Sequence, residues 1–294
     1  MRVLNFGSLN LDYVYSVPRF VRPGETLAAE SGSVMPGGKG LNQSVALARA
    51  GCRVFHAGCV GEGGGSLKKM LEDSGADTSL LRQVSQAQGH TVIQVAPDGE
   101  NCILLFGGSN LCVTQEQVIA VMAGFGPGDW LLAQNEVNLL PFIVEEGYRR
   151  GMTVVLNPSP FGPAVRETDL NKVSWLLINE VEAEGMTGTA DPDKAWARLH
   201  AEYPRLSVLI TLGEKGSVCF TGGEMDKRVW QDAVRVRAAD TTGAGDTYTG
   251  YFIAALSEGV PLEKCMALAS RAAAVSVTRP GAAASIPRRE ELPL

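Results

Sequence analysis

Short apolar runs recur from about residue 130 onward, and each of them ends in a polar residue. They are WLLAQ (130–134), VVLN (154–157), WLLIN (175–179) and VLIT (208–211). Continuous runs of Val, Ile and Leu are typical of parallel strands that helices cover on both faces. The intervals between the runs leave room for a helix in each. The pattern predicts an α/β fold with a doubly wound, mostly parallel sheet and helices on both faces.

The polar residues at the ends of these runs should lie close together. Right-handed crossovers place the carboxyl ends of parallel strands along one edge of the sheet. Open α/β sheets bind their ligands at that edge. We therefore expect a ligand site lined by Gln134, Asn157, Asn179 and Thr211.

Two other segments have the alternation of exposed strands. Residues 91–106 contain two β-rich runs around Asp98-Gly99, a dipeptide that favours a tight hairpin turn. Residues 10–35 alternate in the same way. We predict that excursions at about 10–35 and 90–107 form a small β-sheet lid. Because no repeat or long linker is evident, residues 1–294 are expected to form a single domain carrying this lid.

The charge, the cysteine spacing and the lengths of the apolar runs limit the partners and the compartment that we expect. The chain has 294 residues, of which 45% are hydrophobic, and a net charge of -6. An acidic chain without a long basic cluster is a poor nucleic-acid binder, so we expect no nucleic-acid partner. Its six cysteines lie far apart with no CxxC pair, which fits a reducing compartment. The N-terminus reads as a strand and no apolar run reaches a membrane span, so we expect a cytoplasmic protein without a membrane partner.

The most informative stretch for chemistry is DTTGAGD (240–246). Apolar residues after it recur at helical spacing, so a helix is expected to start near Asp246. Gly243, Ala244 and Gly245 let backbone N–H groups approach a ligand closely. Together with the helix dipole, those N–H groups attract an anion such as a transferring phosphoryl group. This pattern predicts an anion hole.

Asp246 itself has two interpretations. A carboxylate at such a helix start can accept a hydroxyl proton while the hydroxyl oxygen attacks phosphorus, which makes Asp246 a candidate catalytic base. The alternative is that Asp246 only caps the helix and that the glycines form a turn. The segment alone does not decide between them.

The ordered motifs resemble those of the ribokinase-like (PfkB) carbohydrate kinase family. DTTGAGD is similar to the family's C-terminal signature, and PGGKGLN (36–42), leading into an Ala-rich helix, resembles its N-terminal sugar-binding signature. NLD (10–12), PGET (23–26), NPSP (157–160), NEVEAE (179–184) and TLGEKG (211–216) extend the likeness over nearly the whole chain. A lone Gly-Gly-Lys would be weak, but the ordered set is specific.

The resemblance implies two binding regions that meet at Asp246. On the sugar side it implies a substrate site built from Asn10, Asp12, Gly38, Lys39, Gly40, Asn42 and Glu136. On the nucleotide side it implies ATP contacts from Asn179, Thr211, Gly213, Gly216 and Gly245.

The resemblance also implies two cations. It places Mg²⁺ near Asn179 and Glu182, through water. It places a monovalent cation, K⁺, mostly on main-chain carbonyls near Asp240, Thr242, Ser276, Arg279, Gly281 and Ser285.

The function implied is ATP-dependent transfer of the γ-phosphate to a primary hydroxyl of a small sugar, with D-ribose favoured by the short polar side chains. Another sugar, a sugar acid or a nucleoside remains an alternative substrate. A non-catalytic sugar or nucleotide sensor remains an alternative of another class. A Rossmann dehydrogenase or a P-loop enzyme is disfavoured because their glycine motifs are missing. A homodimer formed through the lid is a further expectation.

Overall fold

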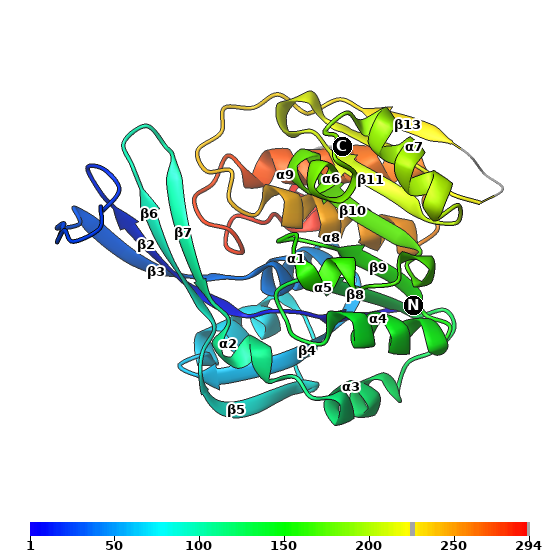
Figure 1. The fold of residues 1–294 in the computed structure, drawn as a ribbon, viewed down its shortest axis with the longest axis horizontal. Helices are drawn as coiled ribbons and strands as arrows, with labels where there is room; N and C mark the ends of the chain where they lie inside the picture. Colours follow the sequence, from blue (N-terminus) through cyan, green and yellow to red (C-terminus); the bar gives the residue numbers. More distant parts are fainter. Residues whose placement is uncertain (224–226, 293–294) are drawn as a thin grey trace.

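The computed structural model describes residues 1–223 and 227–292 of the protein. Its centre is a nine-stranded sheet with the order β5-β4-β1-β8-β9-β10-β11-β12-β13 (Figure 1). The pairs from β5 to β11 are parallel, and β12 and β13 join antiparallel. The predicted mostly parallel sheet is therefore confirmed. Its strands are β1 (Arg2–Phe6), β4 (Arg53–Glu62), β5 (Leu81–Ala87), β8 (Trp130–Gln134), β9 (Thr153–Asn157), β10 (Trp175–Asn179), β11 (Ser207–Thr211), β12 (Ser217–Phe220) and β13 (Arg228–Gln231).

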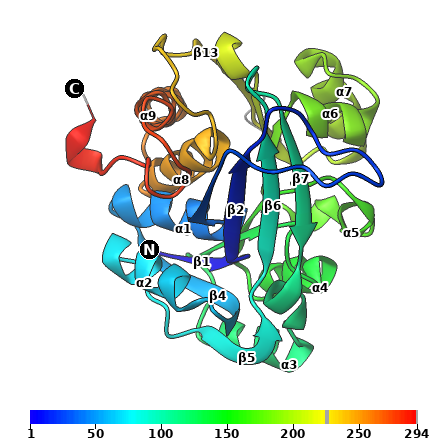
Figure 2. The same cartoon turned by 90° about the vertical axis from the view of Figure 1, so that its left-hand side faces the viewer.

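Helices cover both faces of this sheet (Figure 2). One face carries α1 (Lys39–Arg49), α2 (Gly65–Ser74), α8 (Ala244–Ser257) and α9 (Leu262–Ser276). The opposite face carries α3 (Gln115–Met122), α4 (Leu140–Arg149), α5 (Pro163–Arg166), α6 (Glu180–Thr187) and α7 (Pro192–Glu202). Short 3₁₀ turns are η1 (Gly108–Cys112), η2 (Leu170–Lys172), η3 (Gly213–Lys215) and η4 (Arg289–Glu291).

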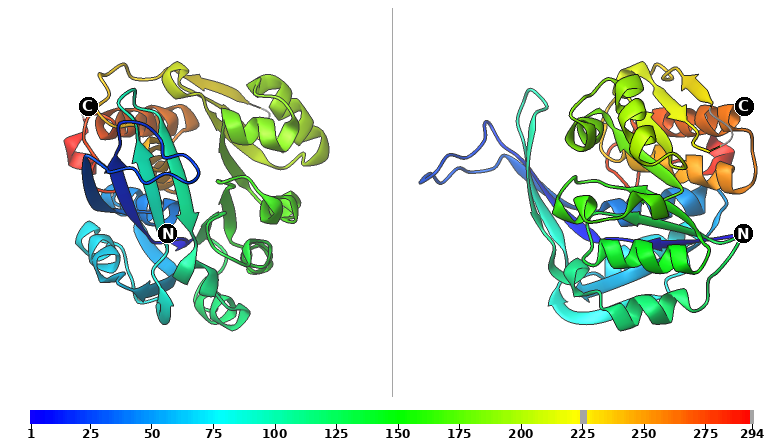
Figure 3. Two further views of the ribbon diagram at one scale, coloured as in Figure 1. Left: turned by 60° about the vertical axis from the view of Figure 1, so that its left-hand side comes forward. Right: turned by 45° about the vertical axis from the view of Figure 1, so that its right-hand side comes forward.

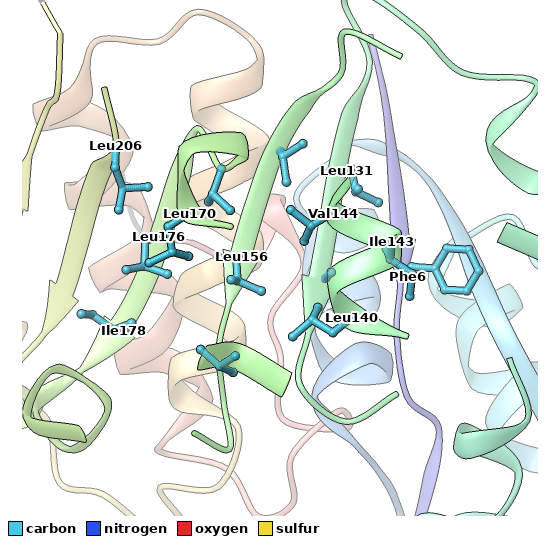
Figure 4. Close-up of a cluster of buried hydrophobic side chains, with 14 of the residues drawn as sticks. Phe6, Leu131, Leu140, Ile143, Val144, Leu156, Leu170, Leu176, Ile178 and Leu206 are labelled. Carbon is cyan, nitrogen blue, oxygen red and sulfur yellow. The ribbon is translucent and has the colours of Figure 1, made fainter. Parts of the chain in front are cut away.

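The central strands are apolar on both faces because each face has its own core. Successive residues of β1 divide between the cores: Leu4 and Phe6 face α3 to α7, whereas Val3 faces α1 and α8. Figure 4 shows the first core, where Phe6 and Leu131 of the sheet meet side chains of α4. This arrangement explains why the strands read as continuous apolar runs rather than as alternating ones. Within the described ranges no helix is both long and apolar enough to cross a bilayer.

The lid is a second sheet that projects from the main body (Figures 1 and 3). It has the order β3-β2-β6-β7. The predicted hairpin at Asp98-Gly99 is confirmed, because β6 and β7 pair antiparallel and Gly99 has a φ of 87°. The strands are β2 (Asn10–Ser16), β3 (Ser31–Gly37), β6 (His90–Val95) and β7 (Asn101–Phe106). β3 runs two residues beyond the predicted boundary, to Gly37.

The polar strand ends meet at one edge, as the pattern predicted. Gln134 pairs in register with Asn157, and Asn179 pairs with Thr211. The strand order reverses between β1 and β8, since the chain builds the sheet outward from these two strands in opposite directions. Such a switch point opens a crevice at the carboxyl ends of the strands.

Candidate active site

The helix α1 starts so close to the end of β1 that side chains would not fit between them. A Cβ atom on Gly40 would lie 2.2 Å from the backbone nitrogen of Ser8 and 2.6 Å from the Cα of Gly7. Gly38 precedes the helix with a φ of 93°, a conformation that favours glycine. The glycines of the 36–42 motif thus allow a backbone approach that brings Lys39 and Asn42 to the switch point.

The second helix of the site, α8, starts at a partly exposed N-terminus, where the Ala244 N–H makes a long bond of 3.3 Å to the Thr241 carbonyl. Its N-terminal flanking residue, Gly243, has a φ of 75°, and no side chain caps the helix. Asp246 is the third residue of α8 rather than the first, and only 8% of it is exposed. Its Oδ2 accepts a hydrogen bond from Asn42 Nδ2 at 2.9 Å, and its Oδ1 accepts one from Gln43 Nε2 at 2.8 Å. The capping interpretation is therefore wrong, because the Asp246 carboxylate bonds to α1.

A cavity of about 200 Å³ opens in front of Asp246. All three predicted anion-hole residues line it, so the first backbone N–H groups of α8 face a space that can hold an anion. Its lining includes Lys39, Asn157, Ser159, Asn179, Glu182, Thr211, Gly243, Ala244, Gly245 and Asp246.

A larger cavity of about 600 Å³ adjoins the first. The two share Thr211, Thr241, Ala244 and Gly245. The walls of the larger cavity are mostly apolar, with Val234, Val236, Tyr248, Ala273, Ala274 and Val277 among them. All five residues predicted to contact ATP line one of the two cavities: Asn179 the smaller, Gly213 and Gly216 the larger, and Thr211 and Gly245 both.

The predicted sugar residues gather at the base of the lid next to Asp246, and one of them, Lys39, also lines the smaller cavity. Glu136 Oε2 accepts the Lys39 backbone N–H at 2.9 Å and a hydrogen bond from the Ser8 hydroxyl. Asp12 in β2 accepts a hydrogen bond from Thr91 Oγ1 at 2.6 Å. A Cβ atom on Gly37 would lie 1.8 Å from Asp12 Oδ2, so this carboxylate occupies the space that a side chain at residue 37 would need.

Asn10, the first residue of the lid strand β2, is held in place by a turn of the main body. Asn10 is buried, and its Oδ1 accepts a hydrogen bond from Asn110 Nδ2 at 2.7 Å. Gly38 lies beside it, because a Cβ there would be 3.0 Å from the Asn10 nitrogen. The structure thus brings together all seven residues predicted on the sugar side.

Several carboxylates share this space, and their charges are coupled. Burial, together with the nearby charges of Glu136 and Asp246, raises the pKa of Asp12 to about 6, although the hydrogen bond from Thr91 opposes this rise. Burial likewise raises the pKa of Glu136. Burial opposes the charge on Lys39, yet Asp246, Glu136 and Glu182 together raise the Lys39 pKa above its usual value. Lys39 is therefore a fixed cation among carboxylates.

The predicted Mg²⁺ residues belong to the start of α6. Glu182 Oε2 accepts the Asn179 backbone N–H at 2.8 Å, and Asn179 Oδ1 accepts the Glu182 N–H at 2.9 Å. This capping box uses one Glu182 oxygen. Among the described residues no cluster of three or more His, Cys, Asp or Glu could hold a metal ion by itself. Glu182 also lines the smaller cavity, so its second oxygen could accept a hydrogen bond from water on an ion there, as the resemblance implies.

Three of the six residues predicted around K⁺, Asp240, Thr242 and Gly281, are in contact. The Asp240 carboxylate accepts the backbone N–H groups of Thr242 at 2.9 Å and Gly281 at 2.8 Å. Ser276 and Ser285 use their hydroxyls on carbonyls of their own turns. The Arg279 side chain instead pairs with Glu291 at 2.9 Å. Cation binding here would therefore fall mainly to main-chain carbonyls, as the resemblance implies.

Some residues of the site were not predicted. Ser8 holds Glu136, and Gln43 holds Asp246. Both positions carry a sequence signal: Ser8 follows the first strand directly, and Gln43 extends the 36–42 motif by one residue. Asn110 gave no signal, because it lies in a turn that contacts the lid only in the folded chain.

Comparisons with known proteins agree with this geometry. Residues 2–289 match the pfkB family carbohydrate kinases. The ribokinase of Haemophilus influenzae is 37% identical over 295 residues, which is 97% of this chain and 95% of the relative. The deoxyribokinase of Salmonella typhi is 31% identical over 99% of this chain and 97% of the relative.

A solved structure gives the same result in three dimensions. The structure of Arabidopsis thaliana ribokinase complexed with ribose and ATP superposes with a TM-score of 0.86. It is 29% identical and covers 98% of this chain and 96% of that chain. The chain belongs to the pfkB family of carbohydrate kinases.

Proposed function

We propose that this protein transfers the γ-phosphate of ATP to a primary hydroxyl of D-ribose. The observation that carries the proposal is the position of Asp246, which lies between the sugar-side polar cluster and the uncapped N-terminus of α8. A base at that position contacts both reacting groups. A sensor that lost catalysis has no need of a buried carboxylate aimed between two ligand sites, so the enzyme is favoured over the sensor.

In the proposed reaction the sugar hydroxyl oxygen attacks the γ-phosphorus while Asp246 accepts the hydroxyl proton, and ADP leaves with the electron pair of the broken P–O bond. The N–H groups of Gly243, Ala244 and Gly245 stabilise the charge that develops on the phosphoryl oxygens. Lys39 adds a cation beside them. Closure of the lid excludes water, which would otherwise compete as acceptor.

The polar cluster under the lid supports a small sugar. Asn42 Oδ1 is buried and has no partner among the described residues, while Nδ2 of the same amide bonds Asp246. A substrate hydroxyl would satisfy that oxygen. Asp12, Glu136 and Asn10 supply further acceptors for a polyhydroxylated ligand. The named relatives act on ribose or deoxyribose, which supports a pentose in this site.

We propose the same two cations that the motifs imply. Mg²⁺ bound near Asn179 and Glu182 would neutralise phosphate charge. K⁺ bound by main-chain carbonyls around Asp240, Thr242, Ser276, Arg279, Gly281 and Ser285 would order the loop that precedes the anion hole. The Asp240 carboxylate already joins both halves of this loop.

The experiment that tests the function is a phosphorylation screen. ADP release should be measured with D-ribose, 2-deoxyribose, fructose, sugar acids and nucleosides, each with and without K⁺. We expect the highest kcat/KM with D-ribose and Mg-ATP, and a lower value when K⁺ is replaced by a bulky organic cation. Release of ADP with none of these acceptors would contradict the kinase proposal, and preference for a nucleoside would reject the sugar.

The raised pKa of Asp12 predicts a pH dependence of sugar binding. An ionised Asp12 accepts paired hydroxyls, and a protonated one accepts them poorly. Because the pKa of Asp12 is about 6, the KM for ribose should rise as the pH falls from 7 to 5. The measurement is KM for ribose against pH in wild type and in Asp12→Asn. The variant should bind weakly at every pH, without the wild-type rise near pH 6, and an unchanged rise would remove Asp12 as its cause.

The environment of the protein forms a further part of the proposal. All six cysteines are free, which suits the cytosol, where ATP is available. The lid strand β7 exposes Ile103, Leu104, Leu105 and Phe106, with 70% of Leu104 in contact with solvent. We propose that a second copy covers this apolar strand and that the protein is a homodimer through the lid.

A further inference from the structure

A buried glutamine stands behind the Asp246 carboxylate. Gln43 follows Asn42 in α1 and has no exposed surface. Its Nε2 donates to Asp246 Oδ1 at 2.8 Å and to Asn157 Oδ1 at 2.9 Å. Its Oε1 accepts a hydrogen bond from Gln134 Nε2 at 2.7 Å. Because protein groups occupy both ends of its amide, Gln43 has no group left for a substrate.

The orientation of this amide is determined by its neighbours. Gln134 also donates to Asn5 Oδ1 at 3.0 Å, and Asn5 Nδ2 donates in turn to the Gly40 carbonyl at 2.8 Å. Asn5, Gln134 and Asn157 lie at the carboxyl ends of β1, β8 and β9. Turning the Gln43 amide over would place its oxygen against a carboxylate and its nitrogen against another donor. The sheet therefore presents a fixed N–H group to Asp246.

The Asp246 carboxylate could instead bond to the N-terminus of its own helix, α8, and the Gln43 N–H group opposes that rotation. A carboxylate at the third position of a helix can turn back and accept N–H groups at the start of its own helix. There it would satisfy the donors that the phosphoryl group needs. In the structure α8 has no such cap, and both Asp246 oxygens are bonded to α1 instead. Of the two donors, Asn42 borders the proposed sugar site, whereas Gln43 is enclosed.

We propose that Gln43 is a positioning residue that holds the Asp246 carboxylate toward the sugar hydroxyl and away from the N-terminus of α8. The inference rests on the base role proposed for Asp246. Without Gln43 only Asn42 holds the carboxylate against rotation toward its own helix, so the carboxylate is more often misplaced for proton transfer. Since Gln43 contacts neither ligand, its loss lowers kcat and leaves the binding of sugar and ATP nearly unchanged.

Gln43→Met tests this, because methionine has a similar length and neither donates nor accepts strongly. We expect kcat to fall about 10- to 100-fold, with KM values for ribose and ATP within about threefold of wild type. Gln117→Met is the matched control: Gln117 also bonds through its amide, to Arg82 and the Gly58 carbonyl, but it belongs to α3, on the face of the sheet opposite α1 and α8. The control should keep wild-type kcat. Wild-type kcat in Gln43→Met, or a loss confined to KM, would overturn the proposal.

A double-mutant cycle separates positioning from general damage. In an Asp246→Asn background there is no base to place, so Gln43→Met should cause no further loss of the residual turnover. An equal loss in both backgrounds would mean a merely structural role. If Gln43→Met does not fold, Gln134→Met replaces it, since that change removes the donor that orients the Gln43 amide. Wild-type turnover in the single variant Asp246→Asn would reject the base role of Asp246. That outcome differs from a failure of the Gln43 proposal, in which Asp246→Asn loses turnover and Gln43→Met does not.

Discussion

Replacing Asp246 with Asn should lower kcat by about 10²- to 10⁴-fold, because the change removes the proposed acceptor of the hydroxyl proton. The side chain keeps its shape. Asn42 can rotate its amide so that its unpartnered oxygen accepts the new N–H group, so local packing is expected to survive. The measurement is steady-state ADP release at saturating ribose and ATP.

The control for this prediction is another buried aspartate. Asp129 is 8% exposed and pairs with Arg2 at the amino ends of β8 and β1, the edge of the sheet opposite the site. Asp129→Asn can lower stability but should leave kcat near the wild-type value. Calorimetry should find the ATP affinity of Asp246→Asn close to wild type. Wild-type turnover in Asp246→Asn would remove the central step of the proposed mechanism.

The second large effect is expected at the crossing of α1 and α8. A Cβ atom on Gly250 would lie 2.3 Å from the Cβ of Ala46 and 2.9 Å from the backbone nitrogen of Leu47. Gly250→Val must therefore push the two helices apart. We expect the free energy of unfolding to fall by about 3 kcal/mol, near the upper end of overpacking costs. Thermal and denaturant unfolding measure this change.

The same substitution should also impair turnover, because the crossing places Asn42 beside Asp246. A displacement of about 1 Å at reacting groups can cost about 10²-fold in rate. Gly65→Val is the matched control, since nothing lies within 4 Å of a Cβ at Gly65, at the start of α2. The control should change stability little and keep its kcat. A Gly250→Val protein as stable and active as the control would show that the close crossing is not required.

The features that could be predicted are those set within a single segment of the chain. The strand runs ending at Gln134, Asn157, Asn179 and Thr211 were predicted correctly, because a two-sided core imposes continuous apolar runs on each strand separately. The Asp98-Gly99 turn was predicted for the same kind of reason, since the positive φ angle is a local requirement. The glycines before Asp246 likewise indicated a helix start with open donors.

The partners of Asp246 could not be predicted in this way. Asn42 and Asp246 are separated by 204 positions, and no periodicity connects them. Whether the carboxylate caps α8 or bonds α1 depends on how closely the helices cross, which Gly250 permits. Glu182 is similar: one of its oxygens caps α6 and the residue also lines the smaller cavity, and no pattern within the segment 179–184 indicates that cavity.

By itself, the sequence determined the layered α/β architecture, the lid hairpin and the identity of the residues at the strand ends and helix starts. These features follow from the pattern of side chains within single segments. The tertiary structure decided which distant groups meet at Asp246, the burial that raises the pKa of Asp12 and the enclosure of Gln43. Hydrogen bonds and pKa values depend on the distances between side chains and on the exclusion of water. These distances and this exclusion are set only when separate segments pack together.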